Sequence, residues 1–189
     1  MKERIKAKAR ELFMRYGFRS VTMDEIAGQL GVSKKTIYQY FTDKDSLVEE
    51  VMQDEMTFMQ MICNKQLSES SNAVEELFRD MEQMNSVMDA MNPQIVYDLE
   101  KFYPKTFERF KKHKNTFLLD VIKKNLIRGI KEELYRPDID IDIAAKFRLE
   151  SSFIAFNQDL WQIQPSESIN RNLSFVPACN SNCKGKKTN

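Results

Sequence analysis

The sequence has few of the residues that interrupt helices and few of those that bind metals. Its 189 residues include five Gly, five Pro, three Cys and one His. So few turn-forming residues exclude a turn-rich all-β protein and favour an all-α fold. The spacing Cys179-x3-Cys183 lacks a second Cys or His pair, so we expect no metal and no other cofactor. Neither a Gly-rich phosphate loop nor a nucleophile elbow is present, and we therefore do not expect an enzyme.

Long apolar runs are also lacking. No stretch approaches the roughly 18 consecutive apolar residues of a membrane-spanning helix. The first six residues, MKERIK, are charged and lead into an amphipathic pattern instead of the apolar segment of a signal peptide. These absences predict a cytoplasmic chain with no membrane partner and no disulfide framework.

The formal net charge of +1 hides an uneven distribution along the chain. Residues 1–46 hold ten Lys or Arg against six Asp or Glu, whereas the remaining 143 residues hold 19 basic and 22 acidic residues. A basic head on a mildly acidic body is typical of a segment that meets a polyanion. Many solvated helices carry a similar excess, so charge alone does not identify the partner.

Apolar residues recur at helical spacing from residue 5 to about residue 161. Helix boundaries are predicted by capping residues and by Gly or Pro at Gly17, Thr22 with Glu25, Gly31, Ser33, Asp43, Asn72 with Glu75, Asn92-Pro93, Tyr103-Pro104, Tyr135–Pro137 and Asp140. The pattern changes from short to long helices near residue 46 and fails after residue 161. We therefore expect an N-terminal domain over 1–46, a helical bundle over 47–161 and an irregular tail over 162–189.

Ala27, Gly31 and Ile37 have the spacing of a helix-turn-helix. Two helices that cross steeply need a small residue at their contact, which Ala27 provides. The tight turn needs Gly31, because glycine adopts backbone angles that other residues avoid. Ile37 then packs the second helix against the first. By itself this spacing occurs often by chance.

The surrounding residues are more specific. Residues 22–47, TMDEIAGQLGVSKKTIYQYFTDKDSL, closely resemble the motif of the TetR/AcrR family, as does the lead-in ARELFxxYG over residues 9–17. The resemblance covers residues 5–50. It implies a transcriptional regulator, usually a repressor, that binds a palindromic double-stranded operator as a homodimer. It also implies release of the operator when a small hydrophobic effector enters the C-terminal helical domain, which serves for ligand binding and dimerisation.

The predicted DNA contacts lie on the second helix of the motif and at two helix N-termini. Lys, Gln and Thr side chains suit base edges in the major groove, hydroxyls suit phosphates, and helix N-termini attract anions. The predicted set is Thr22, Ser33, Lys34, Lys35, Thr36, Tyr38, Gln39, Tyr40 and Lys44. Alternatives remain open: Lys34 and Lys35 contact only phosphates, Tyr40 packs on the first helix, or Thr22 is only a helix cap.

Methionine and phenylalanine gather in the predicted bundle, where adaptable Met side chains suit an apolar ligand pocket. The expected lining is Met59, Phe78, Met81, Phe102, Phe110, Phe117 and Phe153, with an ordinary helical core as the alternative for each. His113 is expected to be a solvated residue on a basic turn.

The alternative function is a helical carrier or small-molecule binding protein without specific DNA binding. Such a protein would not need the motif at 22–47. A second concern is the tail, because the family usually ends with two helices that pair with those of a partner subunit. The sequence offers only one such helix, over residues 140–161, and we expect a weakened homodimer.

Overall fold

The computed structural model describes residues 1–154, and these form helices without a strand. The helices are α1 (Lys2–Tyr16), α2 (Met23–Leu30), α3 (Lys34–Tyr38), α4 (Lys44–Glu69), α5 (Ala73–Ala90), α6 (Ile95–Phe102), α7 (Pro104–His113), the π-helical segment η1 (Lys114–Leu118), α8 (Leu119–Lys131) and α9 (Ile141–Phe153). The all-α prediction is confirmed. The predicted tail, residues 162–189 with Cys179 and Cys183, lies outside the described residues.

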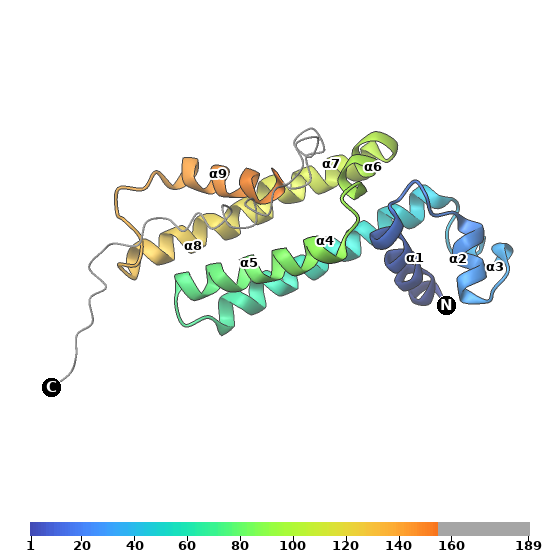
Figure 1. The fold of residues 1–189 in the computed structure, drawn as a ribbon, viewed down its shortest axis with the longest axis horizontal. Coiled ribbons are helices and arrows are strands. Elements are labelled where there is room, and N and C mark those ends of the chain that lie inside the picture. The colour runs from blue at the N-terminus through green and yellow to red at the C-terminus, as the bar shows by residue number, and fades with distance from the viewer. Residues whose placement is uncertain (155–189) are drawn as a thin grey trace.

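The molecule is elongated, with a head of α1–α3 at one end and two helical layers behind it (Figure 1). One layer is the antiparallel pair α4 and α5, and the other contains α7, α8 and α9. The layers contact each other near the head, where α4 meets α7, and again where α5 meets α8. Of the helices described, none is long and apolar enough to cross a membrane.

Most predicted caps form the hydrogen bonds expected of them. The Asn72 side chain accepts from the backbone N–H groups of Val74 and Glu75, and Asp140 accepts from Ile143. The Asp43 carboxylate accepts from the Ser46 N–H at 2.7 Å, while the Ser46 hydroxyl lies 3.3 Å from the Asp43 N–H. These bonds satisfy donors that a helix leaves unpaired at its first turn.

Two predicted boundaries and one predicted capping bond differ from the structure. Pro93 lies in a turn, and α6 begins two residues later at Ile95, because the Asn92 side chain accepts from Gln94 instead of capping a helix at Pro93. Glu75 accepts from the Ser71 N–H and not from its cap residue Asn72. The helix expected to reach Tyr135 ends at Lys131, since Leu134 and Tyr135 both fold back to donate to the Gly129 carbonyl.

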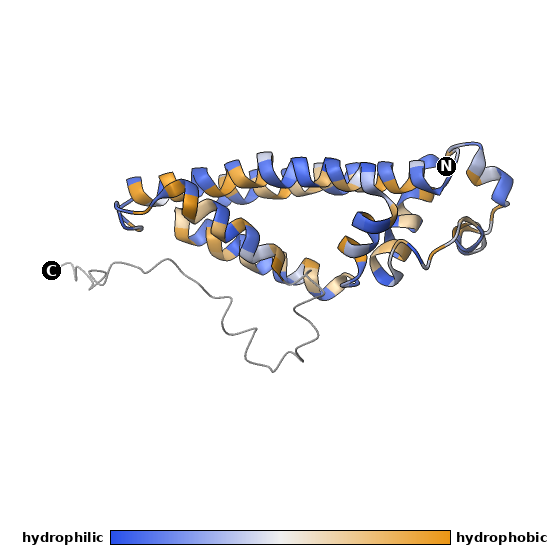
Figure 2. Ribbon diagram, turned by 90° about the horizontal axis from the view of Figure 1, so that it is seen from above, coloured by the Kyte–Doolittle hydropathy of each residue, from blue (hydrophilic) through white to orange (hydrophobic). Residues whose placement is uncertain are grey.

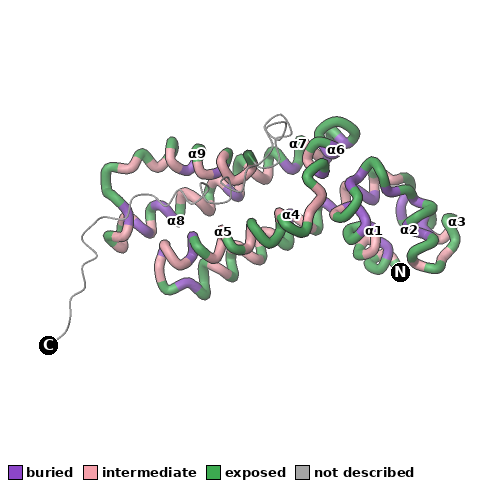
Figure 3. The backbone as a smooth tube through the Cα atoms, in the orientation of Figure 1, coloured by how far each residue is buried: buried purple, intermediate pink, exposed green. Residues whose placement is uncertain are grey.

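The head has a closely packed apolar core. Figure 3 shows buried positions concentrated around α1 and α2, whereas the body is mostly half-buried or exposed. The first turns of α4 and parts of α6 belong to this core as well, so it crosses the boundary predicted at residue 46. Its members are Ile5, Ala9, Leu12, Phe13, Phe18, Val21, Met23, Ile26, Ala27, Ile37, Phe41, Leu47, Val48, Val51, Met52, Ile95, Leu99, Tyr103 and Phe110.

Candidate DNA-binding surface and effector cavity

The helix-turn-helix of the head is built by two caps and one left-handed glycine. The Thr22 hydroxyl accepts from the Glu25 N–H at 3.1 Å and starts α2. Gly31 ends α2 with φ +66°, a conformation that favours glycine. The Ser33 hydroxyl accepts from the Thr36 N–H at 3.1 Å and starts α3. Ala27 and Ile37 are buried between the helices.

This packing leaves one side of α3 and the turn that follows it exposed. Lys35, Tyr38, Gln39 and Tyr40 all face solvent. Tyr40 is 42% exposed, which disfavours the alternative that it packs on α1. Lys35 and Gln39 present a cation and an amide, the two groups suited to guanine and adenine edges.

Three other predicted contacts already have partners. The exposed Lys34 ammonium lies 2.8 Å from the Asp24 carboxylate of α2, which raises the pKa of Lys34. Ser33 and Thr36 share a hydroxyl hydrogen bond of 2.8 Å. Binding of Lys34 to a phosphate or base therefore requires its release from Asp24.

Lys44 is the first residue of α4 and is half-buried. Its ammonium lies 3.5 Å from the backbone carbonyl of Arg19, and burial lowers its pKa. Thr22 is exposed at the start of α2. Both residues thus lie at helix N-termini, where N–H groups favour an anion.

The positive charge of α1 is largely neutralised within the protein. Lys2 and Lys6 pair with Glu50 and Asp54 of α4 at 2.7 Å each, and Arg10 pairs with Glu55. The excess of basic residues over 1–46 therefore overstates the charge available to a partner. What remains near the exposed face of α3 is chiefly Lys35, with Lys34 and Lys44 beside it.

A cavity of about 830 Å³ lies in the body between the two helical layers. Residues from α4, α5, α8 and α9 supply most of its wall, which is mainly apolar. Figure 2 shows how hydrophobic residues alternate with polar ones along these long helices. Of the seven predicted lining residues, Met59, Met81 and Phe153 lie in the wall.

The other four lie elsewhere in the structure. Phe78 is 49% exposed on α5, and Phe102 is exposed on α6 with the Arg19 guanidinium 5.3 Å from its ring. Phe110 is buried in the head core and meets the ring of Phe153 edge-on. Phe117 stacks on His113, so the prediction of a solvated His113 is wrong: this residue is half-buried, and its Nε2 has no hydrogen-bond partner among the described residues.

The pair of Arg148 with Asp80 interrupts the apolar wall, in addition to the pair of Arg10 with Glu55. The Arg148 Nη2 of α9 lies 3.7 Å from the Asp80 Oδ2 of α5. Burial raises the pKa of Asp80 to about 6, lowers that of Arg148 and raises that of the nearby Cys63 thiol to about 11. Neither Asp80 nor Arg148 was predicted as a lining residue, because each reads as an ordinary solvated charge on its helix.

Asn92 and Asp98, which follow α5 in the sequence, also bond the body to the head, and sequence reasoning predicted this role for neither. The Asn92 backbone N–H donates to the Met14 carbonyl at 2.8 Å, and its side chain lies 3.4 Å from the Arg15 carbonyl. Asp98 of α6 is buried and accepts from the Arg19 N–H at 2.9 Å. The one available sequence signal for Asp98 was its place on the same helix face as the apolar residues Ile95 and Leu99.

Comparison with known proteins supports this arrangement. Residues 5–51 match the model of the bacterial regulatory proteins of the tetR family. The chain is 33% identical to the HTH-type transcriptional regulator YvaF of Bacillus subtilis over 104 residues. This aligned stretch covers 54% of each chain. The chain is 21% identical to the transcriptional repressor KstR2 of Mycolicibacterium smegmatis over 78% of this chain and 73% of that protein. The chain thus spans about half the length of YvaF.

The fold is shared with solved structures. A TetR-family transcriptional regulator from Agrobacterium tumefaciens superposes with a TM-score of 0.74 at 16% identity, covering 94% of this chain and 97% of that one. The head, the bundle and the family motif together define a helix-turn-helix regulatory protein. More specifically, residues 5–51 match the bacterial regulatory proteins of the tetR family, and the whole fold is similar to that of a TetR-family regulator.

Proposed function

We propose that this protein is a cytoplasmic, ligand-responsive regulator that represses transcription by binding a palindromic double-stranded operator as a homodimer. The observation that carries the proposal is the exposed surface of α3 and its following turn, which presents Lys35, Tyr38, Gln39 and Tyr40 on a helix-turn-helix of the TetR type. A carrier protein has no use for this surface. The alternative of a small-molecule binding protein without DNA binding is accordingly not favoured.

The nine predicted contact residues divide by the chemistry of their side chains. Lys34, Lys35, Thr36 and Gln39 read base edges from α3, and Tyr38, Tyr40 and Ser33 extend hydroxyls toward the DNA backbone. Thr22 and Lys44 hold phosphates at the starts of α2 and α4. Phosphate contacts position the protein, whereas base contacts specify the sequence.

The connection from the cavity through the end of α5 to the head provides a mechanism for releasing the operator. Met84, Met88 and Met91 at the end of α5 line the cavity, and the next residue, Asn92, is bonded to the end of α1. A ligand that binds one position of α5 better than another shifts the head toward the matching orientation. Operator binding weakens when that orientation no longer places two α3 helices about 34–36 Å apart.

The test compares two head variants on duplexes selected from a random pool by the wild-type protein. Lys44→Ala weakens binding to every duplex and lowers the slope of log affinity against log salt by about one. Gln39→Ala changes the preference at one base position by about 1–3 kcal/mol. Lys65→Ala, at the far end of α4, is the matched control and leaves both quantities unchanged. If wild type selects no preferred sequence, specific DNA binding is refuted.

The homodimer is proposed to form through α8 and α9. Ile127 and Ile143 on these helices are 53% and 69% exposed, and exposed apolar residues favour association. We propose a concentration-dependent monomer–dimer equilibrium, since stable dimers commonly bury about 2,000 Å² or more. Sedimentation velocity over low micromolar concentrations tests it: Ile143→Asp shifts the equilibrium to monomer, and a dimer peak that no dilution changes contradicts the weak association.

A further inference from the structure

One guanidinium in the cavity wall makes no hydrogen bond to a carboxylate of the described residues. Three arginines line the cavity in the described part of the chain: Arg10, Arg136 and Arg148. Arg10 is hydrogen-bonded to Glu55, and Arg136 binds Asp138 through two bonds of 2.9 and 2.6 Å. Arg148 lies 3.7 Å from Asp80, which is beyond hydrogen-bond distance.

A buried polar network holds Arg148 in place. Its Nη1 donates to the Asn125 Oδ1 at 3.0 Å, and the Asn125 amide donates to the Ala73 carbonyl at 2.9 Å. The Tyr135 hydroxyl lies 3.1 Å from the same carbonyl and 3.3 Å from the Asn125 Oδ1. The network fixes the guanidinium without using most of its five N–H donors, so donors remain for a ligand.

Two carboxylates lie near Arg148, those of Asp80 and Glu76. Asp80 faces the guanidinium from α5, with Cys63 of α4 and Glu76 of α5 close to Asp80, and Tyr135 close to Arg148. Glu76 is already bound to Arg128 at 3.0 Å. Burial raises the pKa of Asp80 to about 6, so Asp80 takes up a proton readily when a second anion approaches. Arg148, in contrast, keeps its charge.

We propose that the effector of this protein is an apolar molecule with a carboxylate group, and that Arg148 binds this carboxylate. The proposal rests on the cavity being the effector site, as proposed above. Planar carboxylates fit the guanidinium fork through two parallel hydrogen bonds. Met59, Met81, Met84 and Met88 line the same cavity, and their flexible thioethers adapt to an aliphatic chain.

The experiment uses three probes that share a twelve-carbon chain and differ only at the head: dodecanoate, 1-dodecanol and dodecyltrimethylammonium. Dissociation constants are measured by calorimetry on the full chain at neutral pH, below micelle formation. Dodecanoate binds about tenfold or more tighter than dodecanol, as one charge-assisted pair of hydrogen bonds predicts. Equal binding of all three probes overturns the anchor but leaves the cavity as an effector site. Binding of none overturns both proposals.

Two variants assign the effect to its residues. Arg148→Met removes the preference for dodecanoate while leaving dodecanol binding within about twofold, because it keeps the apolar stem and removes only the charge. Asp80→Asn removes the competing carboxylate and tightens dodecanoate binding several-fold, which also tests the proposal if Arg148→Met folds poorly. If Arg148→Met binds dodecanoate like wild type, the proposal is wrong. If the cationic probe binds tightest and Asp80→Asn abolishes its binding, Asp80 is the anchor instead.

Discussion

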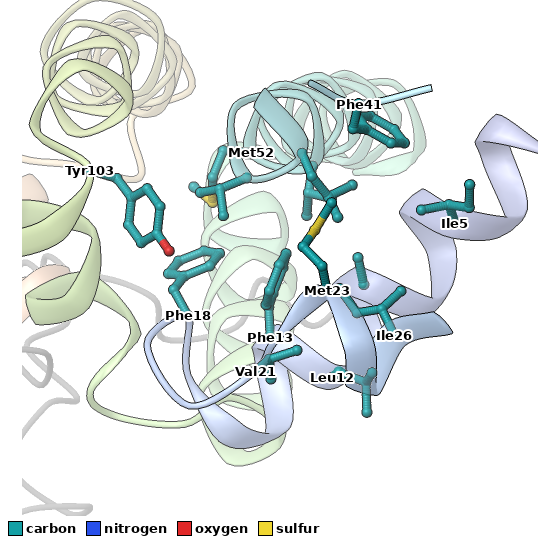
Figure 4. Packing of buried hydrophobic residues seen from close by; sticks show 14 of the residues in the cluster. Ile5, Leu12, Phe13, Phe18, Val21, Met23, Ile26, Phe41, Met52 and Tyr103 are labelled. Carbon is teal, nitrogen blue, oxygen red and sulfur yellow. The ribbon is translucent and has the colours of Figure 1, made fainter. Parts of the chain in front are cut away.

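The head and the far end of the body are stabilised in different ways. The head core is apolar throughout and includes the rings of Phe13 and Phe18, which are tilted at 52° to each other with centroids 5.1 Å apart (Figure 4). The far end of the body buries a much smaller apolar cluster, Ala73, Leu126, Tyr135 and Ala145. There, Arg128 bonds Glu76, Glu132 and the Ser70 carbonyl. Between the two ends lies the cavity.

This difference separates two requirements of a regulator. Close packing holds α3 in one orientation, because a dense apolar core tolerates little change of volume. A cavity wall of methionines between two fixed ends can change shape without unfolding either end. Under the proposed function, the head keeps one geometry for DNA while the body adapts to a ligand.

The largest expected effect comes from removing one ring of the head core. Phe13 has no exposed surface, so Phe13→Ala leaves a void and costs about 3–5 kcal/mol of unfolding free energy. Met81 lines a space that is already open, and Met81→Ala costs about 1 kcal/mol or less, below the usual range for a buried Met. Urea denaturation of both variants measures the contrast. Equal losses would show that the cavity wall is packed like the head.

The second prediction concerns the charge in the cavity wall. Since the folded state raises the pKa of Asp80 above its ordinary 3.8 to about 6, the folded protein binds the extra proton between these values. Ionised Asp80 therefore lowers stability as pH rises through this window. Asp80→Asn gains up to about 3 kcal/mol above pH 6, and the gain disappears toward pH 4. Thermal unfolding of both proteins across this range measures it, and a pH-independent difference contradicts the assignment.

The third prediction compares a glycine at the far end of the body with a glycine in the head. A Cβ on Gly129 would lie 2.1 Å from the ring of Tyr135, whereas one on Gly28 of α2 would have nothing within 4 Å. Gly129→Ala forces the ring and its network apart and costs about 2 kcal/mol. Gly28→Ala gains about 0.5–1 kcal/mol, because alanine favours the helix. Loss of stability in both variants would contradict the close contact at Tyr135.

The head was largely predictable from the sequence, because its structure depends on local chemistry. Thr22 and Ser33 cap the helices as predicted, and Gly31 adopts the left-handed conformation. Ala27 and Ile37 are buried as their spacing implied. Caps and turns act within four residues, so one chain segment contains all of the required information.

The body was less predictable, because its features depend on contacts between distant residues. Phe78 and Met81 are both apolar residues of α5, yet Phe78 is half-exposed and Met81 lines the cavity. Helical spacing indicates a face, but which layer covers that face depends on how α5 meets α8. For the same reason the pairing of Asp80 with Arg148, 68 positions apart in the sequence, has no local signal.

The last and smallest effect tests the connection between the two regions. Asn92→Ala removes the side-chain contact with the Arg15 carbonyl and the bond from Gln94, which costs about 1 kcal/mol of stability. It also lowers the factor by which a cavity ligand weakens DNA binding, because movement of α5 is then transmitted less fully to α1. Asn64→Ala, at an exposed position on α4, is the control and preserves this factor. Fluorescence anisotropy of labelled operator, with and without ligand, measures it. An unchanged factor in Asn92→Ala would shift the connection to Asp98, whose carboxylate holds the Arg19 N–H from the neighbouring helix α6.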